Sequence, residues 1–212
     1  MRPPLDLSCR EGNDAPAYVI AMLLYCLGLD AMPQPQVVDR QLGREPGRTM
    51  EVYMDLFLLL DRGLHVCLVS DIEDSSEEFL RDGIAYLEKL FKEGDEEIRA
   101  SWTPERVAAA QEREREYLER KEGVNRHQFS EVRSELTREL LDHFLADGKA
   151  IQATVWYRTG GDSNGATVLI WAERDGMYCV YDAARDFPHK AATWELLSQV
   201  IDIHECRVWS LP

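Results

Sequence analysis

The sequence predicts an α+β fold in which a helical N-terminal part packs on a C-terminal antiparallel sheet. Segments with apolar residues at helical spacing fill most of the chain up to about residue 146. Apolar strands separated by turn sequences follow from residue 150 onward. Because helices come first and strands last, this order indicates α+β packing and not a doubly wound parallel sheet.

The first elements are predicted from apolar spacing and helix-end signals. Residues 15–27 are apolar on nearly every helical face, so this helix is expected to be buried, and Gly28 ends it. The stretch AMPQPQ is expected to be a connection. Thr49 suits the N-cap of a second helix that ends at Gly63. Residues 64–70, LHVCLVS, predict a short strand.

Charged helices follow this strand. Ser75 and Glu78 have the spacing of a capping box at a helix start. Thr103, followed by proline, is suited to cap the next helix, which carries Glu–Arg pairs. We therefore expect a single domain over 1–212, with residues 73–122 as a charged helical subdomain or lid within it.

The last third carries the predicted sheet. TGGDSNG, between the first two strands of this part, is typical of a hairpin turn or a loop over a cleft. The predicted elements are an amphipathic helix at 130–146, strands at 150–158, 167–174 and 177–183, a helix near 191–199 and a strand at 206–210.

Composition excludes several classes of function. A formal net charge of −15 argues against nucleic-acid backbones and anionic membrane surfaces as partners. The longest apolar run is too short to span a bilayer, and no signal-peptide pattern is present, so we expect a cytoplasmic protein. Five scattered cysteines without a CxxC pair predict neither a disulfide framework nor a zinc site. No phosphate-loop spacing occurs, and we expect no metal and no cofactor.

Three stretches, in this order and spacing, resemble a known family. They are NDAPAYVIAMLLYCLG from residue 13, LGREPGRTMEVYMDLFLLLDRGLHV, and NGATVLIWAERDGMYCVYDAA. Together they resemble the papain-like cysteine peptidase superfamily. More narrowly, they are similar to the peptidases that process bacteriocin leader peptides and to their peptidase-like relatives. The resemblance implies a papain-like fold over nearly the whole chain.

In that family, a cysteine at the start of the first helix is activated by the helix dipole and a strand histidine, which an acid on the next strand orients. The cysteine position falls here at Asp14 or Ala15, and the histidine position at Ala166. Asp182 retains the orienting acid, but no glutamine precedes Gln34 to hold an oxyanion. The resemblance therefore implies that ordinary cysteine-peptidase chemistry is lost.

Asp14 has two readings. In the first, it is a helix N-cap. In the second, it is a general base or an amine-binding group and forms a two-carboxylate pocket with Asp182. An acidic pocket would suit a cationic ligand. Asn164 could supply a hydrogen-bond donor from the glycine-rich stretch. The predicted catalytic residues are thus Asp14 and Asp182, and the predicted binding residues are Asn13, Ala15, Asn164 and Ala166.

Three hypotheses about function remain open. The preferred one is a catalytically altered homologue that binds a peptide, an aminoacyl group, another small amide or amine, or a partner protein. The resemblance suggests a setting in bacterial peptide or natural-product biosynthesis. The second is an active acyl transferase, cyclase or hydrolase that uses Asp14 and Asp182. The third is a cysteine hydrolase through Cys9, with His189 approaching from a loop.

Overall fold

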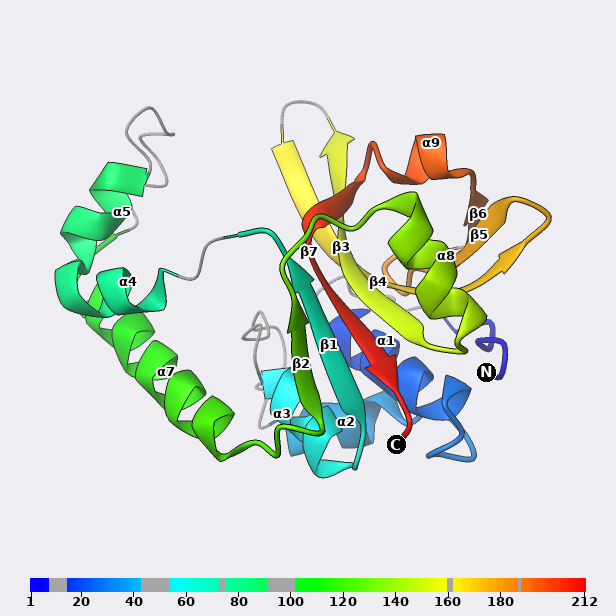
Figure 1. Cartoon of the computed structure of the whole chain (residues 1–212), viewed down its shortest axis with the longest axis horizontal. Helices are drawn as coiled ribbons and strands as arrows, with labels where there is room; N and C mark the ends of the chain where they lie inside the picture. The colour runs from blue at the N-terminus through cyan, green and yellow to red at the C-terminus, as the bar shows by residue number, and fades with distance from the viewer. Residues whose placement is uncertain (8–14, 43–53, 73–74, 91–101, 160–161, 187) are drawn as a thin grey trace. The chain divides into compact units, whose positions relative to one another are not determined.

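The computed structural model describes residues 1–7, 15–42, 54–72, 75–90, 102–159, 162–186 and 188–212 (Figure 1). Within these ranges, eight helices accompany one seven-stranded sheet, so the mixed α and β composition is confirmed. The chain divides into two compact units. The core unit comprises Met1–Ile72 and Arg126–Pro212, and the helical unit comprises Glu73–Asn125.

The sheet belongs to the core unit and has the strand order β2-β1-β7-β3-β4-β5-β6. The C-terminal strands pair antiparallel, as predicted. β1 extends this sheet as an antiparallel neighbour of β7, and β2, which the sequence does not predict, adds a parallel edge beside β1. Parallel neighbours require a crossover connection, and the helical unit lies within that connection. The strands are β1 (His65–Ser70), β2 (Phe129–Val132), β3 (Ala150–Thr159), β4 (Asp162–Arg174), β5 (Met177–Tyr181), β6 (His189–Ala192) and β7 (Ile201–Ser210).

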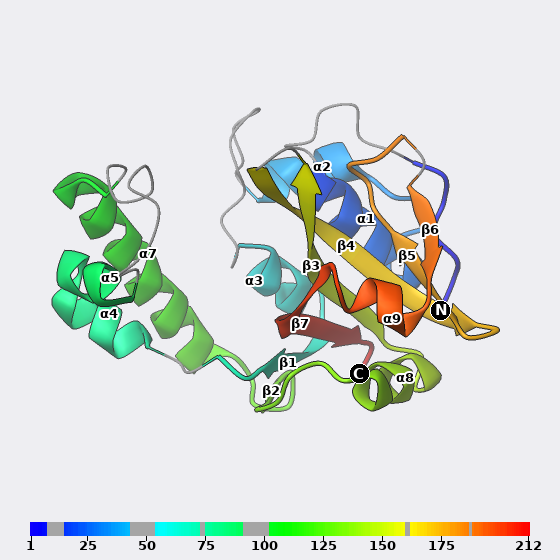
Figure 2. The same cartoon turned by 90° about the horizontal axis from the view of Figure 1, so that it is seen from above.

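Helices cover both faces of this sheet (Figure 2). One face carries α1 (Ala15–Cys26), α2 (Pro35–Gln41) and α3 (Met54–Asp61). The other carries α8 (Arg138–Ala146) and the short α9 (Trp194–Leu197). Nine of the twelve residues of α1 are buried, which confirms the prediction of an enclosed helix.

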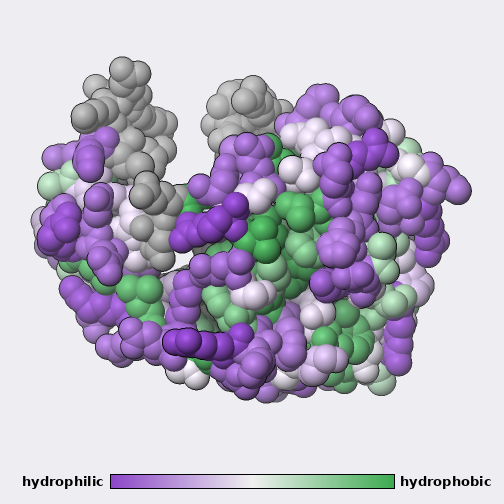
Figure 3. Space-filling model, in the orientation of Figure 1, coloured by the Kyte–Doolittle hydropathy of each residue, from purple (hydrophilic) through white to green (hydrophobic). Residues whose placement is uncertain are grey.

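The core beneath α8 and α9 is formed by alternate strand residues. Ile151, Val168 and Val208 point to this face and pack with Leu141 of α8. Figure 3 shows apolar residues gathered over β7 and the strands beside it, on the side that carries both helices. The partly buried members at the margin include Cys67, Val132 and Ile203.

Four predicted segments differ in the structure. Residues 129–132 form β2, and α8 begins only at Arg138, where Thr137 Oγ1 accepts a hydrogen bond from Leu140 N at 3.3 Å. Helical spacing and strand alternation are hard to distinguish in so short a run. The expected connection contains α2, and β4 begins at Asp162 inside the expected turn. The helix predicted near 191–199 is present as α9, but it is shorter, because residues 191–192 end strand β6.

The helical unit consists of α4 (Ser76–Asp82), α5 (Ile84–Leu90) and α7 (Pro104–Gly123). Thr103 Oγ1 accepts a hydrogen bond from Arg106 N at 3.3 Å, so the predicted cap of α7 is confirmed. The predicted capping box is wrong, because Ser75 makes no side-chain cap and its hydroxyl hydrogen-bonds Tyr86 instead. Gly83 separates α4 from α5.

Candidate functional site

The N-terminal segment of the core unit runs along α1 toward the start of that helix. Arg2 N donates to Cys26 O at 2.8 Å, and Leu5 N donates to Met22 Sδ at 3.3 Å. As the segment advances from Arg2 to Leu5, its hydrogen-bond partners in α1 move from Cys26 back to Met22, toward the start of the helix. Tyr181 Oη then donates to Leu7 O at 2.6 Å. The last described residue before the chain returns to α1 is thus fixed to the end of β5.

The start of α1 is buried. Ala15, its first residue, is 3% exposed, and the first turn contains no acidic side chain. The first backbone N–H groups of a helix have no partner within it and give this end a partial positive charge. The helix packs against β4, the central member of the β3–β4–β5 ribbon. A group that accepts hydrogen bonds or carries negative charge would be stabilised near this helix end.

Asp182 follows β5 directly and is 1% exposed. Its Oδ1 accepts a hydrogen bond from Ala184 N at 3.1 Å, and its Oδ2 lies 3.7 Å from Arg185 Nε. Its own N–H donates to Pro188 O at 2.8 Å. The carboxylate is therefore fixed within a tight turn, one residue beyond the tyrosine that holds Leu7.

The other predicted residues are not gathered around Asp182 by the described structure. Asn13 and Asp14, like Cys9, lie outside the described residues. Asn164 lies in β4 opposite Tyr157, and its side chain is also outside what the structure describes. The proposed pairing of Asp14 with Asp182 therefore stays a prediction.

Ala166 lies in β4 opposite Val155, whose side chain belongs to the core beneath α8 and α9. The β3–β4 register is continuous here, so Ala166 shares the strand face of Val168. The helix that begins at Ala15 covers the opposite face (Figure 2). The register consequently does not place these two alanines on one side of the sheet.

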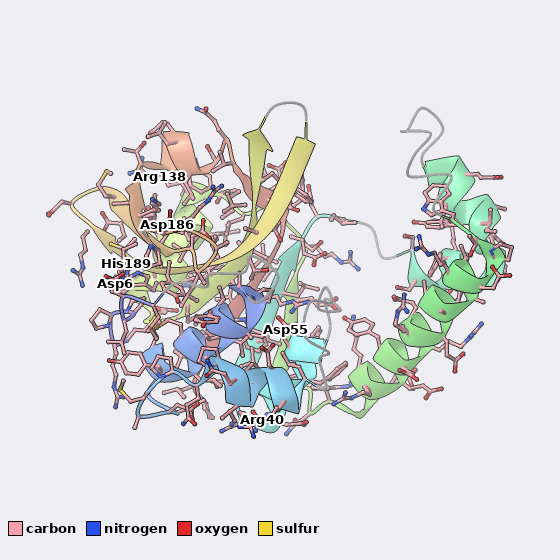
Figure 4. All side chains as sticks on the ribbon, turned by 180° about the vertical axis from the view of Figure 1, so that it is seen from behind. Asp6, Arg40, Asp55, Arg138, Asp186 and His189 are labelled. Atoms are coloured by element: carbon pink, nitrogen blue, oxygen red, sulfur yellow. The ribbon has the colours of Figure 1, made fainter. Side chains whose placement is uncertain are left out.

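His189 is exposed and begins β6, where it pairs with Tyr181. The expectation of a loop position is wrong, because His189 and Lys190 begin the edge strand. The ring centroids of His189 and Tyr181 are 5.8 Å apart. Figure 4 labels His189 together with Asp6 of the N-terminal segment, which runs beside β6 in this view and in Figure 2.

Two of the described cysteines are poorly suited to nucleophilic chemistry. Burial raises the pKa of the Cys26 thiol to about 12 and that of the Cys206 thiol to about 12. A nucleophilic cysteine requires the thiolate at neutral pH. Cys26 and Cys206 therefore act as packing residues.

A buried polar network that sequence reasoning missed joins α3 to the sheet. Arg207 Nη1 donates to Asp55 Oδ1 at 2.6 Å, and Gln152 Nε2 donates to Asp55 Oδ2 at 2.7 Å. Trp209 Nε1 donates to Gln152 Oε1 at 2.8 Å. Figure 4 labels Asp55 at the start of this network. Its only sequence signal is the placing of polar residues within apolar runs.

The helical unit has a hollow of about 720 Å³. Its serines already have partners, because Ser76 Oγ donates to Glu114 at 2.7 Å and Ser75 bonds Tyr86. The hollow therefore offers no free nucleophile from these serines. It is lined by Ser75, Ser76, Glu77, Glu78, Leu118, Lys121 and Glu122.

No protein-family model matches the chain, and no curated protein matches it closely enough to be counted a relative. Among the described residues, no group of three or more histidine, cysteine or acidic side chains is arranged to hold a metal ion. None of the helices in the described ranges is both long and apolar enough to cross a membrane. Among the predicted site residues, Asp182 is the one whose carboxylate the described structure fixes by hydrogen bonding in a buried turn.

Proposed function

We propose that the core unit is a catalytically altered papain-like peptidase homologue that binds a peptide or aminoacyl group beside Asp182. The observation that carries this proposal is the burial of the Asp182 carboxylate in a hydrogen-bonded turn at the end of β5. Tyr181, the preceding residue, holds the chain segment that leads to α1. The resemblance of the sequence to leader-processing peptidases suggests a setting in bacterial peptide or natural-product biosynthesis.

Loss of thiol chemistry is supported by the residues at the expected catalytic positions. The strand position that the resemblance assigns to the histidine carries Ala166, which has no ionisable group and which the strand register places on the sheet face opposite α1. The buried thiols of Cys26 and Cys206 have raised pKa values, so neither supplies a thiolate at neutral pH. A site that keeps its acid without a base is better suited to binding than to peptide hydrolysis.

A cationic ligand group is favoured by the surroundings of Asp182. The chain carries a net charge of −15, so an approaching cation is attracted before contact. Arg185, whose side chain is 43% exposed, lies 3.7 Å from the Asp182 carboxylate. A ligand ammonium or guanidinium would displace this partly exposed side chain and take its place beside the carboxylate.

The test is fluorescence anisotropy with two fluorescein-labelled hexapeptides of matched length, one containing lysine and glycine and the other glutamate and glycine. We expect the wild type to prefer the lysine peptide. Asp182→Asn should weaken its binding about tenfold or more, because a hydrogen bond to a charged group contributes about 1.5–3 kcal/mol. Asp186→Asn, which alters an exposed carboxylate in the same turn, should leave binding unchanged.

Arg185→Gln provides a second readout that does not disturb the buried acid. It should tighten binding of the lysine peptide, because it removes the competing cation. Equal binding of the two peptides by the wild type, or full binding by a folded Asp182→Asn variant, would contradict the proposal. Turnover of a peptide anilide or thioester that Asp182→Asn abolishes would support the acyl-transfer alternative instead.

A further inference from the structure

The core unit ends its first segment at Ile72, two residues beyond β1, and the helical unit begins at Glu73. Asp71, between the strand and this junction, is bound to β7 by backbone and side chain. Asp71 N donates to His204 O at 3.3 Å. The Nδ1 atom of His204 lies 3.0 Å and 3.1 Å from the two carboxylate oxygens of Asp71. The strand end is therefore held by a histidine–carboxylate pair.

Two further contacts fix the residue beside the junction. Ile72 N donates to Ser70 Oγ at 3.2 Å, and Arg133 Nη1 donates to Ile72 O at 2.8 Å. Arg133 directly follows β2, the parallel neighbour of β1. Side chains from two segments that are distant in sequence thus hold Asp71 and Ile72 against the sheet.

Neighbouring carboxylates raise the pKa of the His204 imidazole. The hydrogen bond with Asp71 raises its pKa most, followed by the charge of Asp71, and Asp202 and Glu135 add smaller effects in the same direction. Partial desolvation acts the other way. Asp71 extends from the end of β1, Asp202 lies in β7, and Glu135 precedes α8. The side chain is 56% exposed, so salt will screen these charges.

We propose that His204 and Asp71 form a pH-sensitive latch that sets the rigidity of the junction between the core unit and the helical unit. Protonated His204 forms a charged pair with Asp71 and holds the strand end. Because the pKa in the folded state lies above the unfolded value, this stabilisation is complete below the unfolded pKa of about 6.5. The stabilisation is lost as the pH rises through the folded-state pKa, because a neutral imidazole can donate only an uncharged hydrogen bond to Asp71.

The experiment is ¹⁵N relaxation of the intact chain at about pH 5.5 and about pH 9, on either side of an ordinary histidine pKa of about 6.5. We expect the rotational correlation time of the helical unit to fall relative to that of the core unit as the pH rises. At both pH values, His204→Gln should give the ratio of correlation times that the wild type shows at high pH. Asp71→Asn should lower the pKa of His204 and weaken the response.

His143→Gln is the matched control, because His143 is an exposed residue of α8 whose Nε2 lies 3.7 Å from a carboxylate oxygen of Asp147. It should retain the wild-type response. A His204 resonance that titrates while the ratio of correlation times stays constant would overturn the latch. A pH response that persists in His204→Gln would overturn it equally.

Discussion

Asp55 is an acidic residue in the first turn of an apolar helix, and both of its carboxylate oxygens have partners. We expect Asp55→Ala to destabilise the core unit by about 3–5 kcal/mol, because it leaves the largely buried Arg207 without this carboxylate. Urea unfolding measures the change. Glu139→Ala, an exposed carboxylate on α8, should change stability by less than about 0.5 kcal/mol. A small effect of Asp55→Ala would mean that Arg207 is satisfied elsewhere.

Individual residues of the candidate site differ in how far sequence predicts them. Asp182 is identified because it occupies a position that the resemblance assigns to an acid. Gln152 and Arg207 interrupt apolar strands, but nothing in the sequence shows that both contact Asp55, which is 97 and 152 residues away respectively. Pairings at such separations depend on the strand order, and local patterns do not contain it.

At the scale of the elements, Gly83 determines the break between helices α4 and α5 in the helical unit. Its backbone angles, φ 54° and ψ −117°, are accessible mainly to glycine. An added Cβ would lie 3.1 Å from Gln111 Nε2, which donates to the carbonyls of Phe79 and Leu80 at the end of α4. We expect Gly83→Ala to cost about 1–3 kcal/mol in strain, measured by guanidinium unfolding followed by circular dichroism.

Gly123→Ala is the control for this substitution. Gly123 closes α7 without a positive φ, and no atom lies within 4 Å of an added Cβ. Its replacement should be neutral or stabilise the unit by about 0.4–1 kcal/mol. Equal effects of the two substitutions would show that the break between α4 and α5 does not depend on the glycine conformation.

Elements with local signals were predicted, and elements created by tertiary pairing were not. The enclosed helix α1 and the Thr103 cap of α7 follow from apolar spacing and a capping residue. In contrast, β2 is specified by its pairing with β1, and β6 exists because β5 offers it an edge. The sequence does not predict α2, because proline suits both the first turn of a helix, where Pro35 lies, and an irregular connection.

At the scale of the whole chain, the helical unit is an insertion in a crossover between parallel strands. We expect residues 73–125 to be replaceable by a flexible linker of about a dozen residues, the minimum for such a connection. The core unit should keep its near-ultraviolet circular dichroism and a cooperative unfolding transition. A linker of about four residues is too short to connect parallel neighbours and should disrupt the β1–β2 pairing. Loss of structure with both linkers would show that the helical unit is needed for the core to fold.

The position of β1 in the sheet has a consequence for how the protein is made. Its antiparallel neighbour β7 is the last of the seven described strands in chain order, and the contact between Asp71 and His204 spans 133 residues. Until β7 emerges, one edge of β1 has no strand to pair with, while the helical unit can already form from local contacts. Newly made chains should therefore need chaperone protection of this strand until β7 has been synthesised.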